Sequence, residues 1–139
     1  MKIVSACLAG VKCHWDGKVK PNQLIVNLVK EGNAIPVCPE QLGGLPTPRV
    51  PAEQKGKRVI TRDGVDVTSF FDSGAQEALK IANLVKCEVA ILKARSPSCG
   101  HGKIYDGTFS GKLIKGDGVF AKILKQNGIK VISDEELDY

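Results

Sequence analysis

The chain has 139 residues, enough for one hydrophobic core but too few for two ordinary domains, so we predict a single domain over residues 1–139. Apolar residues make up 42% and charged residues 25%, a globular balance, and no apolar run approaches the roughly 20 residues of a membrane span. The start of the chain lacks the pattern of a signal peptide, so we expect a cytoplasmic protein with no membrane partner. The net charge of +5 comes from scattered lysines, which favours a solvated surface over a nucleic-acid patch.

Apolar runs and helical periodicity alternate along most of the chain. This pattern predicts strands at residues 2–6, 33–37, 59–60 (a short edge strand), 88–93 and 129–132, and helices at residues 22–30, 67–86, 117–126 and 133–137. We expect Thr68 and Asp117 to cap the second and third helices, and residues 7–20, 38–58 and 94–115 to form loops. The alternation predicts an α/β fold, a three-layer sandwich around a mainly parallel, Rossmann-like sheet of about four to five strands.

Three cysteines that are remote in the sequence follow predicted strands. Cys7 and Cys38 come directly after the first two strands, and Cys99 lies in a turn beyond the fourth. Ligands of parallel α/β sheets bind at the carboxyl ends of the strands, so we expect these thiols to share one pocket. Three thiolates can hold zinc with water as the fourth ligand, or an iron–sulfur cluster with one iron not bound by cysteine. The alternative is that each is a small buried residue with an inert thiol.

The other two cysteines give weaker signals. Cys13 lies in the loop after Cys7 and could be a further ligand, a substrate-side thiol or a plain loop residue. Cys87 follows the long predicted helix, and a buried apolar filler is the simpler interpretation of it. A thiol redox pair of Cys7 and Cys13 is disfavoured because the two do not form a CxxC motif. A dinucleotide site is not expected, since the GxGxxG and GxxxxGK[ST] motifs are absent from the sequence.

Polar residues beside these cysteines could carry chemistry. Glu40, two residues after Cys38, is a candidate general acid or base, or else a carboxylate that caps backbone N–H groups. Ser96 and Ser98 flank a proline just before Cys99. Their hydroxyls could orient a substrate, although such residues more often bind the backbone of their own turn.

Arg49 and Trp15 are candidates for contacting a substrate. Arg49 follows two prolines that restrict the backbone, so its guanidinium could be aimed at a carboxylate or phosphate, with a structural ion pair as the alternative. Trp15 could stack on a flat ring or close a small hydrophobic cap. His101 and Lys103 could reach anions beyond Cys99, or could be exposed loop residues.

Together these stretches resemble a family of small prokaryotic proteins that was long filed as a domain of unknown function and is now linked to thiouracil desulfidases. The resemblance runs over essentially the whole chain, and the stretch CPEQLGGLPTPR is highly specific. It is carried by SACLAG (residues 5–10), PVCPEQLGGLPTPR (36–49), SPSCG (96–100) and YDGTF (105–109).

The resemblance implies a [4Fe-4S] cluster held by Cys7, Cys38 and Cys99, with a fourth iron open to the sulfur of a thiolated pyrimidine. It also implies a non-redox desulfuration, in which thiouracil or a 4-thiouridine nucleotide is hydrolysed to the oxo form and hydrosulfide is released. The catalytic carboxylate and hydroxyl of the family match Glu40 and Ser96. The expected substrate-binding residues are Arg49, Ser98, Trp15 and Gly100.

The expected partner is therefore a small thiolated pyrimidine or its nucleotide. Relatives that act on transfer RNA would carry an additional domain, so we do not expect a nucleic-acid partner, and a homo-oligomer is compatible with the sequence. The alternative function is a non-catalytic module that binds a metal or a small anion. Glu40 and Ser96, each close in sequence to one of the three cysteines, favour the enzyme.

Overall fold

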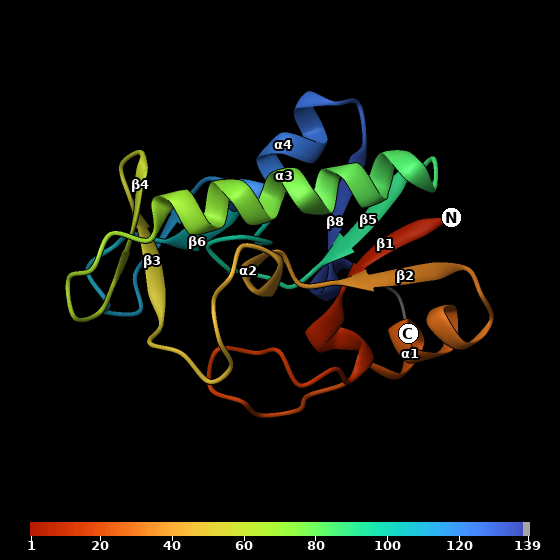
Figure 1. The fold of residues 1–139 in the computed structure, drawn as a ribbon, viewed down its shortest axis with the longest axis horizontal. Helices are drawn as coiled ribbons and strands as arrows, with labels where there is room; N and C mark the ends of the chain where they lie inside the picture. Colours follow the sequence, from red (N-terminus) through yellow and green to blue (C-terminus); the bar gives the residue numbers. More distant parts are fainter. Residues whose placement is uncertain (138–139) are drawn as a thin grey trace.

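The computed structural model describes residues 1–137, and its centre is a four-stranded parallel sheet (Figure 1). The sheet contains β1 (Lys2–Ser5), β2 (Ala34–Val37), β5 (Val89–Leu92) and β8 (Lys130–Ser133) in the order β2-β1-β5-β8. All three strand pairs are parallel, and Ser5 of β1 lies opposite Val37 of β2. The predicted α/β fold with a parallel sheet is confirmed.

Helices cover both faces of this sheet, which makes three layers (Figure 1). Successive side chains of a strand point to opposite faces, so Ile3 packs in the cluster under the helices α3 (Thr68–Leu84) and α4 (Val119–Gln126). Val4 packs on the other face with α1 (Gln23–Lys30) and the 3-10 turn η1 (Ala6–Ala9). A second 3-10 turn, η2 (Asp134–Glu136), follows β8. No helix within residues 1–137 is long and apolar enough to cross a membrane.

Two segments expected to be loops contain hairpins, and this is the main correction to the predicted elements. In the first, β3 (Ala52–Lys55) pairs antiparallel with β4 (Arg58–Thr61), so the strand predicted at 59–60 is not an edge of the main sheet. In the second, β6 (Lys103–Tyr105) pairs with β7 (Leu113–Lys115). The sequence signal was weak because these strands are only three or four residues long and rich in polar side chains.

The two predicted helix caps are wrong. Val67 precedes α3 without a side-chain cap, and the carboxylate of Asp66 accepts from the Thr68 backbone N–H at 2.9 Å instead. Gly118 precedes α4, while the Asp117 side chain accepts from the backbone N–H of Gly102 at 2.9 Å. Asp117 therefore ties a neighbouring loop to α4 rather than capping the helix.

A short helix, α2 (Pro39–Leu42), also lies in a segment expected to be a loop, and it packs against α3 backbone to backbone. A Cβ atom built on Gly74 would lie 1.8 Å from the carbonyl oxygen of Pro39. A Cβ on Gly43 would lie 2.0 Å from the carbonyl oxygen of Phe70. Because no side chain separates the two helices, α3 fixes the position of α2 and of the Cys38 that precedes it.

We predict that Gly74→Ala lowers the free energy of unfolding by about 1–3 kcal/mol, because the new methyl group must push α2 away from α3. Alanine is otherwise about 1 kcal/mol better than glycine inside a helix, so the sign of the change tests the contact. Urea denaturation measures it, with the exposed Ser73→Ala in the same helix as the control. Stabilisation by Gly74→Ala would contradict the backbone contact.

Candidate active site

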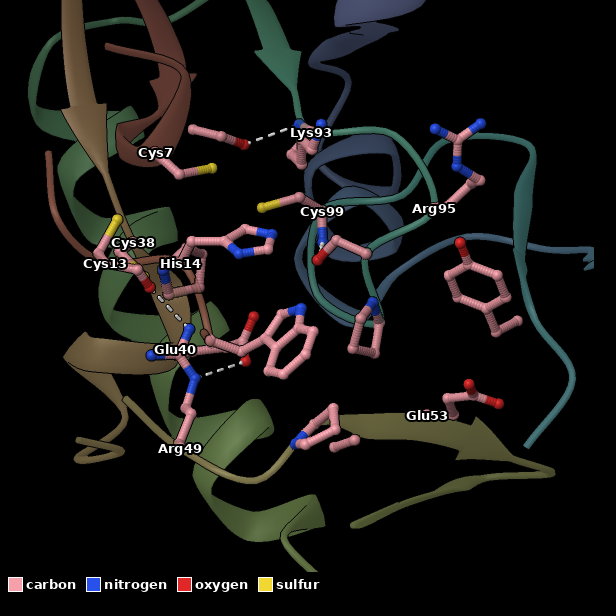
Figure 2. Close-up of a pocket in the computed structure, with 18 of the residues that line it drawn as sticks. Cys7, Cys13, His14, Cys38, Glu40, Arg49, Glu53, Lys93, Arg95 and Cys99 are labelled. Carbon is pink, nitrogen blue, oxygen red and sulfur yellow. Dashed lines mark hydrogen bonds and ion pairs between the residues drawn. The ribbon is translucent and has the colours of Figure 1, made fainter. Parts of the chain in front are cut away.

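The carboxyl ends of β1, β2 and β5 open into one cavity of about 420 Å³ (Figure 2). Its walls come from these strand ends, from α2, from the loop after η1, from β3 and from the segment 105–111. Cys7, Cys13, Cys38 and Cys99 all line it, and each is a free thiol. The three cysteines that were expected to share one pocket therefore do line a common cavity.

Each of the three cysteines is placed by a short structure that follows its strand. Cys7 lies in η1, which ends at Gly10 in the left-handed conformation (φ 91°). Cys38 has extended backbone and is the N-cap residue that directly precedes α2. Cys99 lies in the turn formed by residues 96–100, beyond the end of β5. Short connections of this kind leave little freedom to the thiols once the sheet is formed.

The turn at 96–100 is held from two sides. A Cβ atom on Gly118 would lie 2.3 Å from the Ser98 carbonyl oxygen, so the start of α4 packs directly on the turn. Within the turn, Ser96 Oγ accepts from the backbone N–H groups of Ser98 at 3.1 Å and Cys99 at 3.0 Å. Ser96 thus stabilises the backbone of its own turn. It also lines the cavity, and its O–H hydrogen is not used by these two bonds.

The thiol of Cys13 lies between those of Cys7 and Cys38. Its single S–H hydrogen can be donated to either neighbouring sulfur, which lowers the pKa of Cys7 and lowers the pKa of Cys38 to about 7. The same interactions favour the protonated form of Cys13 and raise its pKa. Burial raises the pKa of Cys99. Within residues 1–137, no three histidine, cysteine, aspartate or glutamate side chains lie close enough together to hold a single metal ion.

Arg49 joins the carboxylate of Glu40 to the loop that carries Cys13. Its Nε donates to Glu40 Oε1 at 3.1 Å, and its Nη2 donates to the Cys13 carbonyl oxygen at 2.9 Å. Its Nη1 donates to the Pro46 carbonyl oxygen at 3.1 Å and to Thr47 Oγ1 at 3.0 Å. The side chain is only 7% exposed, and its guanidinium donates to protein acceptors and not to solvent.

The remaining predicted residues divide into those that line the cavity and those that do not. Trp15 lines it and is 40% exposed. Ser98 and Gly100 are buried in the Cys99 turn and do not line it, and Ser98 Oγ has no hydrogen-bond partner among residues 1–137. His101 and Lys103 also lie outside this cavity.

Four charged residues of the cavity were not singled out from the sequence: Glu53, Arg62, Lys93 and Arg95. Lys93 directly follows β5, so the rule that ligands bind at strand ends could have found it. Glu53 and Arg62 belong to the hairpin region of β3 and β4, which reaches the cavity only through the tertiary fold.

The fold and the cavity define an α/β protein with a thiol-lined site at the carboxyl edge of a parallel sheet. The chain matches the family model for 2-thiouracil desulfurase over residues 3–136, and it belongs to this family. The resemblance inferred from the sequence motifs is confirmed.

Two relatives show how far this likeness extends. The uncharacterized protein YbbK of Bacillus subtilis (strain 168) is 45% identical over 148 residues, which cover 99% of this chain and 98% of YbbK. A solved structure of the [4Fe-4S]-dependent thiouracil desulfidase TudS (DUF523Vcz) is also 45% identical, with a TM-score of 0.92. The match covers 97% of this chain and 91% of TudS.

We predict that Cys13→Ala raises the pKa of Cys38 from about 7 toward the ordinary thiol value, because the thiolate loses its main hydrogen-bond donor. In reduced, metal-free protein at neutral pH, alkylation of Cys38 by iodoacetamide should slow by roughly tenfold, since only the thiolate reacts. Mass spectrometry across a pH series measures this rate, with Cys87→Ala as the control outside the cavity. An unchanged pH profile would contradict the thiol contact.

Proposed function

We propose that this protein is a [4Fe-4S]-dependent desulfidase that converts a thiolated pyrimidine to its oxo form. The observation that carries the proposal is the convergence of Cys7, Cys38 and Cys99, from three strand ends, on a cavity that Glu40 also lines. The likeness to TudS supports it. The net reaction is a hydrolysis: water gives its oxygen to the ring carbon, the C–S bond breaks, and sulfur leaves as hydrosulfide with a proton. No electron donor is needed.

Cys7, Cys38 and Cys99 would hold the cluster. The neighbouring Cys13 thiol lowers the pKa of Cys7 and of Cys38 and so favours their thiolates, the form in which cysteine binds a metal. The described residues offer no three ligands close enough for a single ion, whereas a cluster presents a different iron to each cysteine. When bound, the cluster would supply an open iron that acts as a Lewis acid for the thiocarbonyl sulfur.

Glu40 is proposed to take the proton of the attacking water. Arg49 binds its Oε1, which leaves Oε2 without a hydrogen-bond partner among residues 1–137. The carboxylate is only 17% exposed and held by a buried guanidinium, so it presents this second oxygen in a defined direction. A general base held in this way needs no reorganisation at the moment of proton transfer.

Ser96 is proposed to position the water or the base. Its oxygen already accepts from two backbone N–H groups, so the hydroxyl hydrogen remains as the group it can offer to the cavity. Accepting two hydrogen bonds polarises the O–H and makes it a better donor. Ser98 and Gly100 would act on the site only through the shape of the Cys99 turn.

Arg49 is proposed to affect the substrate through Glu40, because its donors are taken by Glu40, Thr47 and two backbone carbonyl groups. Trp15, which lines the cavity with a partly exposed ring, is the better candidate for direct contact with a flat base. An ion pair was the alternative considered for Arg49 from the sequence, and the geometry favours that alternative.

A nucleotide form of the substrate is supported by three cations that line the cavity. Arg95 pairs with Glu135 at 3.1 Å, and the Lys93 ammonium lies 4.0 Å from Asp134. Arg62 is in none of the ion pairs formed within residues 1–137. A phosphate attached to the pyrimidine through a sugar would meet positive charge here.

We predict that Cys99→Ala abolishes cluster binding, because only two of the three proposed ligands remain. Iron and sulfide content and visible absorbance after anaerobic reconstitution measure this loss. Cys87→Ala, which removes a thiol outside the cavity, should bind as much iron as the unaltered protein. Full iron content in the Cys99 variant would contradict the ligand set.

We predict that Glu40→Gln retains the cluster absorbance and lowers kcat by at least about 100-fold, because an amide cannot accept the proton of water. Activity is measured as hydrosulfide release from 2-thiouracil and from 4-thiouridine monophosphate. Glu88→Gln, an exposed change just before β5, serves as the matched control. Full activity of the Glu40 variant would remove the proposed base, and a loaded but inactive unaltered protein would favour the non-catalytic module.

A further inference from the structure

A second carboxylate, Glu53 on β3, lines the cavity and is only 9% exposed. Its Oε1 accepts from the backbone N–H of Gly107 at 3.0 Å and from that of Phe109 at 3.1 Å. Its Oε2 has no hydrogen-bond partner among residues 1–137, and no arginine, lysine or histidine there pairs with it. Because a carboxylate oxygen can only accept hydrogen bonds, this unpaired oxygen of a cavity-lining residue suits a ligand that brings a donor.

Glu53 cannot easily turn away from the cavity. A Cβ on Gly107 would lie 2.8 Å from the carbonyl oxygen of Gln54, so the segment 105–111 packs directly on β3. The Gln54 side chain donates to the Pro97 carbonyl oxygen at 3.0 Å and to the Asp117 carbonyl oxygen at 2.9 Å. The strand is thereby fastened to the Cys99 turn, and moving Glu53 would leave two backbone N–H groups without an acceptor.

The position of Glu53 in the cavity indicates which part of a bound substrate could donate a hydrogen bond to it. Figure 2 shows Glu53 at the opposite end of the cavity from Cys7 and Cys38. If the substrate sulfur lies at the cysteine end, Glu53 meets the part of the substrate most distant from the C–S bond. In a 4-thiopyrimidine this part is the substituent on N1, across the ring from C4. A phosphate would be repelled by the carboxylate, whereas the hydroxyl groups of a sugar are neutral donors that suit it.

We propose that Glu53 is a specificity-determining residue whose Oε2 accepts a hydrogen bond from a ribose hydroxyl of the substrate. The site then prefers ribonucleosides and ribonucleotides of a thiopyrimidine over deoxy analogues and over the free base. An acidic residue that binds ribose hydroxyls is an established device in nucleotide sites of other α/β folds. This inference rests on the proposed desulfidase function, since it places the substrate sulfur at the cysteine end.

The test compares substrates that differ only in the group that Glu53 is proposed to bind. Reconstituted holoprotein is assayed on 4-thiouridine monophosphate, on its 2′-deoxy and 3′-deoxy analogues and on free 4-thiouracil. The unaltered protein should prefer the ribonucleotide over at least one deoxy analogue by about 10- to 100-fold in kcat/KM, the size of one hydrogen bond to a charged group. Glu53→Gln should reduce this preference to a few-fold, mainly through KM, and should lower kcat/KM for the ribonucleotide far more than for the free base.

Glu53→Gln is a mild change, because its amide oxygen can still accept from both backbone N–H groups while an NH₂ donor replaces Oε2 in the cavity. Glu77→Gln, on the exposed face of α3, is the matched control and should behave as the unaltered protein. Equal losses on the ribonucleotide and the free base would overturn the proposal, since Glu53 would then serve the ring or the fold. Equal kcat/KM values of the unaltered protein for ribo and deoxy substrates would also overturn it.

A binding measurement separates this inference from the proposed function. Calorimetry of the holoprotein with uridine monophosphate and its deoxy analogues needs no turnover. Tighter binding of the ribonucleotide, lost in Glu53→Gln, would support the role of Glu53 even if no thio-substrate were turned over, and the desulfidase proposal alone would fail. Equal binding of ribo and deoxy nucleotides by the unaltered protein would contradict the proposed role of Glu53, even where desulfuration is observed.

Discussion

The parallel pairing of β1 with β2 and β5 is the constraint on which the site depends. Ser5 lies opposite Val37, and Val4 lies opposite Ile91, so all three strands end at the same edge of the sheet. A few residues further on, each chain segment delivers a cysteine to that edge. Parallel strands bring together residues that are far apart in sequence, because each return to the same edge requires a crossover connection.

The second constraint is the buried guanidinium of Arg49. It holds the carboxylate of Glu40 and the carbonyl group of Cys13 at once, and so joins the acidic and the thiol parts of the cavity. A buried arginine needs several acceptors to replace the water it loses, and this one has a carboxylate, a hydroxyl and two carbonyl groups. The electrostatics of the site are therefore built into the folded loop and do not depend on a substrate.

The far wall of the cavity is made differently, from hairpins that lie outside the main sheet. Glu53 and Gln54, adjacent on β3, use opposite sides of the strand to bind two different segments. The Glu53 carboxylate binds the backbone N–H groups of Gly107 and Phe109. The Gln54 side chain binds the Pro97 carbonyl group in the turn that carries Cys99. This arrangement links the end of the cavity that is remote from the thiols to the position of one of the thiols.

The sequence alone predicted the four strands of the sheet, the three amphipathic helices α1, α3 and α4, and the convergence of the strand-end cysteines. Hydrophobic periodicity identifies elements that bury an apolar face, and that rule covers β1, β2, β5, β8, α1, α3 and α4. It also led to the site, because Cys7 and Cys38 follow buried strands closely, Glu40 lies two residues after Cys38, and Cys99 lies in the turn beyond β5. The family motifs added the cluster and the chemistry, which no periodicity contains.

Only the tertiary structure decided which polar residues complete the cavity and what each one binds. The hairpin strands are short and polar, so nothing in their sequence reports that Glu53 and Arg62 reach the cavity. Whether Arg49 meets a substrate or Glu40, and whether Cys13 contacts Cys7 and Cys38, depends on distances between loops that are far apart in the chain. Local patterns encode which face of an element is buried, but contacts between loops are set only when the sheet has brought them together.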